Sequence, residues 1–230
     1  MKRNVILYLI IVLTGIHIVS CEKEKLTDTS PVNTNPSFIE EFDTVGNLSQ
    51  KGWVFRNNSK PGGFAQWAQA TGLFPTFSYF WDGLEYAACN FASGTGVSNL
   101  SVWMITKPIS VKNGDIISFY TRTVSAVFFP DRLQFRANFI DSNPDVGNDS
   151  ASVGNFTKLI FDINPNQLFS GPDSYPVAWT KYEYFVSGLP TIRVPVNYRF
   201  AFRYYVTAGG FSGSNSDYIG VDRLEFISVQ

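Results

Sequence analysis

The sequence predicts an all-β domain in which two antiparallel sheets pack face to face. Residues 132–140, RLQFRANFI, alternate between apolar and polar side chains, and residues 198–206, YRFAFRYYV, do the same. This period of two is typical of strands with one buried face. Clusters of Gly, Pro, Asn and Asp, such as NNSKPGG and SNPDVGND, separate the apolar stretches. A strand with one apolar face needs a second sheet to cover it, so the pattern indicates a β-sandwich.

The expected strands follow one another from residue 38 to the end of the chain, each bounded by turn-forming residues. The stretch 64–70, FAQWAQA, is the one segment whose pattern is briefly helical. The sequence shows no internal repeat and no second domain. The expected strand ranges are 38–42, 53–56, 85–91, 102–106, 115–123, 132–140, 156–163, 182–186, 198–206 and 214–226.

The last of these strands changes phase in its middle. Ile219 and Val221 alternate with small residues, and the alternation resumes at Leu224 in the opposite phase. Asp222 and Arg223 stand at the change. One extra residue at this point, a β-bulge, lets both halves of the strand face the core and redirects one side chain.

The N-terminus predicts export. Lys2 and Arg3 precede an apolar run over residues 5–19, which is too short to span a bilayer comfortably, and small Ser20 precedes Cys21. This is the arrangement of a lipoprotein signal peptide, residues 1–20, with Cys21 as the lipidated residue. Residues 21–36 are polar and predict a flexible tether, and residues 37–230 predict the folded domain.

Removing the signal peptide excludes several chemistries. The single histidine, His17, leaves with it, and so do two of the 18 basic residues, which gives a mature net charge of −3 against 19 acidic residues. No Ser/His/Asp or Cys/His nucleophile and no His-ligated zinc is then available. The acidic balance argues against nucleic-acid binding. Cys89 has no intramolecular partner once Cys21 carries lipid.

Two acidic sets are candidates for a metal site. Residues 141–149, DSNPDVGND, place carboxylates and an amide at alternate positions, but Gly147 is one place late for a calcium loop and the closing Glu is missing. This loop is better interpreted as a polar hairpin connection. Glu41 or Asp43 at the end of the first strand, together with Asp222 in the last, is the preferred candidate for structural calcium, because oxygen ligands suit that ion.

Aromatic residues make up 16% of the chain and provide the candidate ligand-binding residues. Trp53 and Trp103 lie inside strand patterns and are expected in the core. Three further rings fall between the expected strands, at Tyr79, Phe80 and Trp81. A ring in such a position can stack on a sugar or pack in the core, and the sequence favours neither role over the other. Catalysis by paired carboxylates, as in most glycosidases, is the remaining enzymatic alternative, although no spacing in the chain pairs two acids.

Eight stretches follow one another along the chain as landmarks: EEFD, GWVFRNNSKPGG, VWMITKPISVKNGDIISFYTRTV, FPDRLQFR, ASVGNFTKLIFDINP, YPVAWTKYEYFVSGL, FAFRYYV and GSNSDYIGVDRLEF. Together they resemble the choice-of-anchor J domain of bacterial surface proteins, which is similar in turn to cleaved adhesin domains. The resemblance extends from residue 38 to residue 227. It implies a single jelly-roll β-sandwich displayed outside the cell, with structural calcium by analogy to the adhesin domains, and it implies no general ligand or activity.

Together these observations predict a monomeric lipoprotein that carries a non-catalytic, adhesin-like or carbohydrate-binding-like module. Its expected partner is a glycan or a host or surface protein. The charged residues after Cys21 resemble the short signals that send some Bacteroidetes lipoproteins to the outer face of the outer membrane, although a plain soluble linker explains them equally well. The alternatives are a glycan-active jelly-roll enzyme and a structural component of the envelope.

Overall fold

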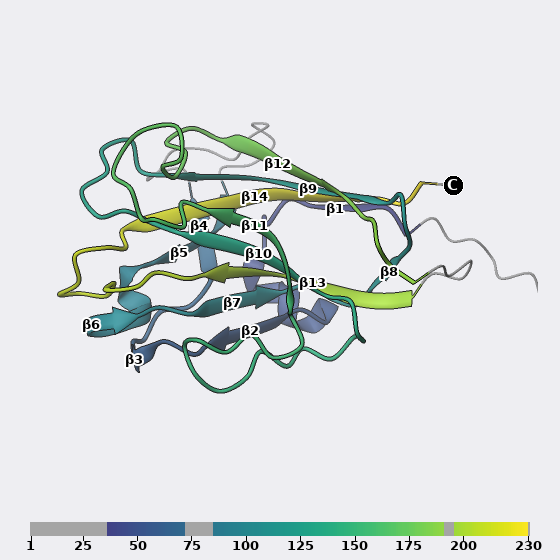
Figure 1. Cartoon of the computed structure of the whole chain (residues 1–230), viewed down its shortest axis with the longest axis horizontal. Helices are drawn as coiled ribbons and strands as arrows, with labels where there is room; N and C mark the ends of the chain where they lie inside the picture. The colour runs from purple at the N-terminus through teal and green to yellow at the C-terminus, as the bar shows by residue number, and fades with distance from the viewer. Residues whose placement is uncertain (1–35, 72–84, 191–195, 230) are drawn as a thin grey trace, which may run out of the picture. The chain divides into compact units, whose positions relative to one another are not determined.

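The computed structural model describes residues 36–71, 85–190 and 196–229, which form a jelly-roll β-sandwich of two large antiparallel sheets (Figure 1). In the first sheet β1 (Phe38–Glu40) pairs with β14, and the other strands follow the order β12 (Thr180–Phe185), β9 (Ile116–Thr123), β14 (Tyr218–Ile227), β5 (Glu85–Asn90) and β4 (Ala68–Thr71). In the second sheet β8 (Ile109–Val111) pairs with β13, and the order is β11 (Lys158–Ile163), β10 (Leu133–Asn138), β13 (Val196–Tyr204), β7 (Val102–Ile105) and β2 (Val54–Asn57).

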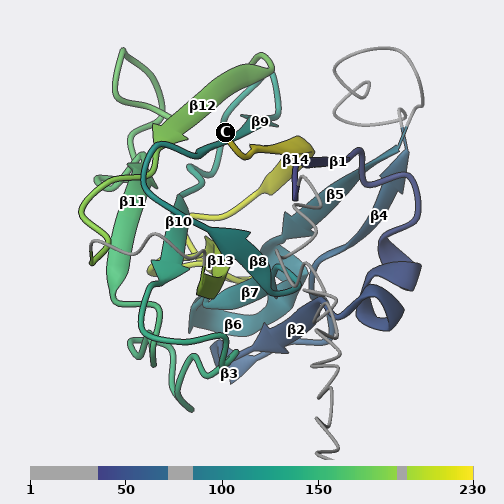
Figure 2. The same ribbon diagram turned by 90° about the vertical axis from the view of Figure 1, so that its right-hand side faces the viewer.

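Smaller elements complete the domain. A two-stranded sheet is formed by β3 (Lys60–Gly62) and β6 (Gly94–Asn99), and a short 3-10 helix, η2 (Phe91–Ser93), connects β5 to β6. A second 3-10 helix, η1 (Val45–Lys51), contacts β4 and β2 and buries Val45 and Leu48 beside the edges of the two sheets (Figure 2). No helix among the described residues is long and apolar enough to cross a membrane.

The core lies between the two sheets and is centred on three phenylalanine rings. Phe119 comes from β9 of the first sheet, while Phe135 and Phe202 come from β10 and β13 of the second. Their ring centroids lie 4.8 to 4.9 Å apart, and all three side chains are fully buried. The apolar positions of the alternating stretches 132–140 and 198–206 therefore face the core from adjacent strands, as the sequence predicted.

The long connection between β10 and β11, residues 139–157, covers the outer face of the second sheet. Val146 and Phe156 from this connection pack with Trp103, Ile105 and Ala201 in a second apolar cluster. Such a cluster explains why β7 is buried on both faces.

Arg203 holds the same connection through a fully buried guanidinium. Its Nη2 donates to the carbonyl of Ser150, and its Nε donates to the Ser101 hydroxyl at 3.0 Å. The guanidinium lies between the rings of Trp103 and Tyr205, with its Cζ 4.8 and 3.8 Å from the two ring centres. Burial lowers the pKa of Arg203 to about 10, so the side chain stays charged at neutral pH.

The helical expectation for residues 64–70 is wrong. Residues from Ala68 onward form β4, which pairs with β5 along Ala68↔Ala88 to Thr71↔Glu85. Trp67 is buried and its indole N–H donates to the Val102 carbonyl at 3.0 Å. The edge of β5 supplies hydrogen bonds to this segment, and that pairing overrides the helix propensity of the Ala and Gln residues. The short strands β3, β6 and β8 were also not predicted from the sequence.

The predicted β-bulge in the last strand is confirmed. The register of β14 against β9 shifts between Asp222 and Glu225, and Arg223 has a positive φ of 47°. Ile219 and Val221 before the shift are fully buried, and so are Leu224 and Phe226 after it.

The pairing register places one set of loops at a single end of the sandwich, here called the loop end. In the first sheet Ile219 pairs with Thr123, and in the second sheet Leu133 pairs with both Ile163 and Tyr204. The loop end contains residues 58–67, 91–101, 124–132, 164–179 and 205–217. β1 begins far from it, because Phe38 pairs with Phe226, eight residues along β14 from Tyr218.

The bulge predicts opposite outcomes for two neighbouring side chains of β14. Leu224 is fully buried, whereas Ile227, which uninterrupted alternation from Ile219 would point inward, is 40% exposed. Leu224→Ala is therefore expected to lower the free energy of unfolding by about 2–5 kcal/mol, and Ile227→Ala by less than about 1 kcal/mol. Urea unfolding of both variants measures the difference. Equal losses, or a larger loss for Ile227→Ala, would contradict the register.

Candidate functional site

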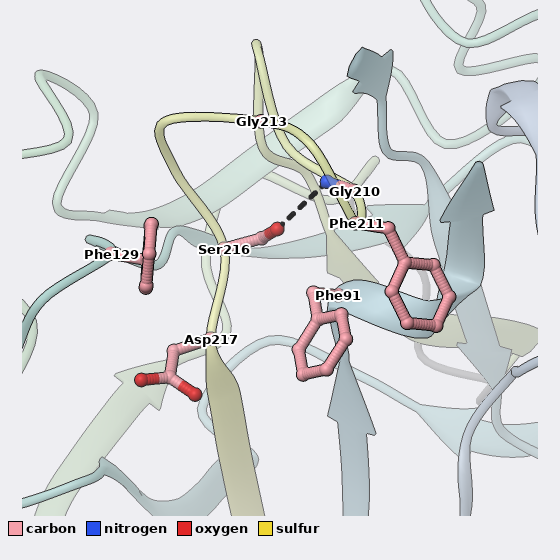
Figure 3. A pocket seen from close by; sticks show the side chains of 7 residues that line it. All are labelled: Phe91, Phe129, Gly210, Phe211, Gly213, Ser216 and Asp217. Carbon is pink, nitrogen blue, oxygen red and sulfur yellow. Dashed lines mark hydrogen bonds between the residues drawn. The ribbon is translucent and has the colours of Figure 1, made fainter. Parts of the chain in front are cut away.

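The loop end contains a phenylalanine-lined hollow of about 180 Å³. Phe91 follows β5, Phe129 lies between β9 and β10, and the remaining walls belong to the loop of residues 205–217 between β13 and β14 (Figure 3). The seven residues that line the hollow are Phe91, Phe129, Gly210, Phe211, Gly213, Ser216 and Asp217.

The rings around the hollow are in contact with one another and open to solvent. Phe91 and Phe211 meet edge to face, with centroids 5.0 Å apart and an interplanar angle of 85°. Phe64 lies 6.1 Å from Phe211 on the other side and is 81% exposed. Phe128 and Phe129 are also exposed. Exposed apolar side chains grouped in this way are characteristic of interaction sites.

The loop of residues 205–217 is turned tightly on itself, and glycine makes this possible. Gly210 has a φ of 89°, and a Cβ there would lie 2.5 Å from the carbonyl oxygen of Gly96. A Cβ on Gly213 would lie 2.3 Å from the carbonyl oxygens of Ala208 and Gly209. The hydroxyl of buried Ser216 accepts a hydrogen bond from the Gly210 N–H at 2.9 Å. These contacts hold the wall of the hollow in one shape.

A buried carboxylate, Asp131, fixes both ends of this loop. The Tyr204 hydroxyl, just before the loop, donates to Asp131 Oδ1, and the Asp217 N–H, at its end, donates to the same oxygen at 2.8 Å. The Thr123 hydroxyl donates to Oδ2 at 2.6 Å. Burial raises the pKa of Asp131 to about 6, although the hydrogen bonds from Thr123 and Tyr204 act in the opposite direction.

Asp217 is the one acidic residue among the described residues that line the hollow. Its backbone is held by Asp131 and its carbonyl accepts from the Phe91 N–H at 3.0 Å. Within the part of the chain that the structure describes, no hydrogen bond or ion pair reaches the Asp217 carboxylate. Partial burial raises the pKa of this group above its ordinary value.

The sequence-predicted metal residues lie where the first and last strands meet. β1 pairs with β14 in the register Glu40↔Leu224, so Glu41 lies close to the bulge, where it forms an ion pair with Arg223. Asp222 is buried, and its Oδ1 accepts from the backbone N–H of Arg223 at 2.8 Å. Asp43 is exposed. Across residues 36–71, 85–190 and 196–229 no three His, Cys, Asp or Glu side chains form a group suited to a metal ion. Calcium binding stays a prediction.

The acidic loop of residues 141–149 uses its oxygens to fold its own backbone. The Asp141 carboxylate accepts from the Asn143 N–H at 2.9 Å, and the Asn143 amide oxygen accepts from the Asp145 N–H at 3.1 Å. Asp145 and Asp149 each accept from the N–H two residues later in the same way. These successive Asx turns agree with the interpretation of a polar hairpin connection.

The other predicted site residues, Tyr79, Phe80 and Trp81 for ligand binding and Cys21 for lipidation, lie outside the described residues. The residues that line the hollow were not among the predicted site residues. The available signal was phenylalanine next to turn formers, in VFFP at residues 127–130 and in GGFSG at residues 209–213. A large apolar residue in such a loop has no strand face to fill, so it is a candidate for contact with a partner.

Three solved structures of cleaved adhesin domains from Lys-gingipain are similar to this chain. The K1 domain from Porphyromonas gingivalis W83 aligns with a TM-score of 0.51 and 15% identity, over 84% of this chain and 99% of that domain. The chain shares the cleaved adhesin fold. The K2 domain aligns with a TM-score of 0.51 and 18% identity, over 84% of this chain and 99% of that domain. The K3 domain from Porphyromonas gingivalis W83 aligns with a TM-score of 0.50 and 13% identity, over 84% of this chain and 98% of that domain. No protein-family model and no curated protein sequence matches the chain.

The Asp131 carboxyl predicts a pH dependence of stability. Its folded pKa, about 6, lies above the unfolded value of about 3.9. Its contribution to the free energy of unfolding is therefore fully present below about pH 4 and is lost as the pH rises to about 6, by on the order of 1–3 kcal/mol. When the acid is neutral and its proton lies on Oδ2, the bond to Thr123 reverses direction: Oδ2 donates to the Thr123 hydroxyl, which then donates to the Tyr218 carbonyl, 2.9 Å away.

The Asp131→Asn variant tests whether ionisation of Asp131 causes this loss of stability. The amide N–H₂ of Asn replaces the donating O–H of the acid, and the amide oxygen still accepts from Tyr204 and Asp217. Urea unfolding is measured from about pH 4 to about pH 7 for both proteins. The variant is expected to gain stability relative to wild type as the pH rises through this range. Asp173→Asn, at an exposed acid of the same end, is the control. A constant difference between Asp131→Asn and wild type would contradict the assignment.

Proposed function

We propose that this protein is a non-catalytic, surface-displayed binding module whose loop-end hollow receives part of a glycan or protein ligand. The observation that supports this most directly is the group of exposed phenylalanines around a preformed hollow. Exposing such rings to water is unfavourable, and covering them with a partner recovers roughly 25 cal/mol per Å² of apolar surface. Rings at the centre of an interface commonly provide most of its binding energy.

A binding role is also favoured over glycan hydrolysis by the acids at the hollow. Most glycosidases use two carboxylates on either side of the scissile bond. Among the residues that the structure describes, Asp217 is the only one that brings a carboxylate to the hollow, and Asp131, which accepts from the Asp217 N–H, is fully buried and engaged by three donors.

We further propose that the domain is a choice-of-anchor J module on a lipid anchor at Cys21, exported to the outer membrane and exposed at the cell surface. The cleaved adhesin fold and the lipoprotein-type N-terminus support this. The position of β1 is also suitable: it begins at the end of β14 opposite the loop end, so a tether joined there leaves the hollow accessible to ligands.

Structural calcium at the junction of β1 and β14 is part of the same proposal. Glu41 and Asp222 both lie at the bulge, which supports a shared role for their oxygens.

The binding role predicts that removing rings at the hollow weakens ligand binding without loss of the fold. Phe211→Ala and Phe129→Ala are each expected to weaken binding by about tenfold or more, measured on a glycan array and on immobilised host-matrix proteins. Phe185→Ala is the matched control, because Phe185 is 61% exposed, comparable to Phe211 at 55%, and lies at the far end of β12. An equal effect of Phe185→Ala, or turnover of a polysaccharide by the wild type, would refute the proposal.

The calcium proposal predicts that chelation lowers the Tm of the wild-type domain. An ion that binds only the folded state stabilises it by a few kcal/mol when its concentration is well above its Kd. Differential scanning calorimetry with and without excess chelator measures the shift, and Asp222→Ala is expected to abolish it. An unchanged wild-type Tm would exclude a stabilising site.

A further inference from the structure

We infer that the hollow at the loop end binds a positively charged side chain, a lysine or arginine on the surface of a partner protein. This inference rests on the proposed function and identifies the ligand group that the hollow selects. It is based on three properties of the lining: its aromatic rings, its single carboxylate, and the scarcity of other polar groups.

The aromatic rings are the first property. Phe91, Phe129 and Phe211 supply three of the seven lining residues, and Phe64 extends the ring surface from Phe211 outward. The π-face of an aromatic ring attracts ammonium and guanidinium groups, and the attraction strengthens when the site is partly shielded from water. The protein already uses this chemistry elsewhere, since Arg203 lies against Tyr205 and Trp103.

The charge of the hollow is the second property. The Asp217 carboxylate has no hydrogen bond or ion pair among the described residues, and partial burial reduces its hydration. Asp131 lies directly beneath, joined to the Asp217 N–H, and adds a second negative charge at neutral pH. The described part of the chain brings no Lys or Arg to the lining of the hollow. Arg132 of the same end is engaged in a bidentate ion pair with Asp162. A cationic ligand group supplies the missing counter-charge.

The scarcity of other polar groups favours an alkyl cation over a sugar. Sugar hydroxyls need several precisely placed hydrogen-bonding groups. Within residues 36–71, 85–190 and 196–229, the polar side chains that line the hollow are those of Ser216 and Asp217, and the Ser216 hydroxyl already accepts from the Gly210 N–H. The rings are phenylalanines, which lack the polar group that Tyr and Trp offer. A lysine or arginine side chain instead combines an apolar stem with a charged head.

The volume of the hollow agrees with this ligand. At about 180 Å³, the hollow is small. Such a space accommodates one extended side chain, so the selected group is a single residue of the partner and not a folded element.

The test uses the full domain and small probes that share a butyl chain and differ in their polar head group, one charged and one neutral. n-Butylammonium and its neutral counterpart n-butanol are titrated into the protein, and binding is followed by NMR shifts of the residue 205–217 backbone. The same titration with Nα-acetyl-lysine methylamide examines the complete side chain. The cations are expected to bind and the alcohol to bind at least about tenfold more weakly, the loss expected for one charge-assisted contact.

Matched variants locate the charge. Asp217→Asn is expected to weaken binding of the cations by about tenfold or more and to leave binding of the alcohol unchanged. Asp173→Asn, which neutralises an exposed acid at the same end outside the hollow, is expected to change neither. For the wild type, raising the salt concentration from about 0.05 M to about 0.5 M is expected to weaken binding of the cations selectively. This measurement does not depend on the folding of a variant.

Results that would overturn the cationic ligand differ from results that would overturn the proposed binding role. Equal binding of cation and alcohol, an unaffected Asp217→Asn variant, or no binding of the cations would overturn the cationic ligand. The proposed binding role would still stand if Phe211→Ala abolished capture of a glycan or matrix protein. Loss of that capture by Phe185→Ala to the same degree would overturn the binding role itself.

Discussion

The placement of apolar residues in β14 is the constraint on which the rest of the domain depends. This strand pairs with β9 along one side and with β5 and then β1 along the other. A regular strand would bury Ile219 and Val221 and expose Leu224 and Phe226. A left-handed conformation at Arg223 costs about 1–2 kcal/mol, whereas burying Leu and Phe contributes roughly 1.5–3 kcal/mol each. The bulge is therefore favourable, and the Arg223 ion pair with Glu41 joins it to the end of β1.

Buried polar groups hold the long loops on this frame. Asp131 connects β9, β13 and the start of β14, and it thereby fixes the loop that forms one wall of the hollow. On the outer face of the second sheet, Arg203 similarly holds the connection of residues 139–157, by donating to the Ser150 carbonyl. Each charge loses hydration, and each regains interactions from three hydrogen-bonding partners. Removing one partner from such a group costs more than the pair contributes.

The fold was predictable because its strands are long, periodic and bounded by turn formers, and the bulge was predictable because a phase change is visible in sequence. The short strands β3, β6 and β8 were not predictable, since segments of three to six residues are too short to show a clear period. The segment that contains β4 was predicted to be helical, because its strand conformation depends on pairing with the edge of β5 and not on its own sequence pattern. The hollow was not predictable, because Phe91, Phe129 and Phe211 come from three separate loops, and only the strand register brings them together.

The antiparallel pairing of β1 with β14 also determines how these two strands would respond to a mechanical load. A force applied at Phe38 and directed away from the loop end, opposed by a force on the start of β14 directed toward the loop end, would run parallel to both strands. Under such a load the hydrogen bonds between β1 and β14 would be sheared together instead of being peeled apart one at a time.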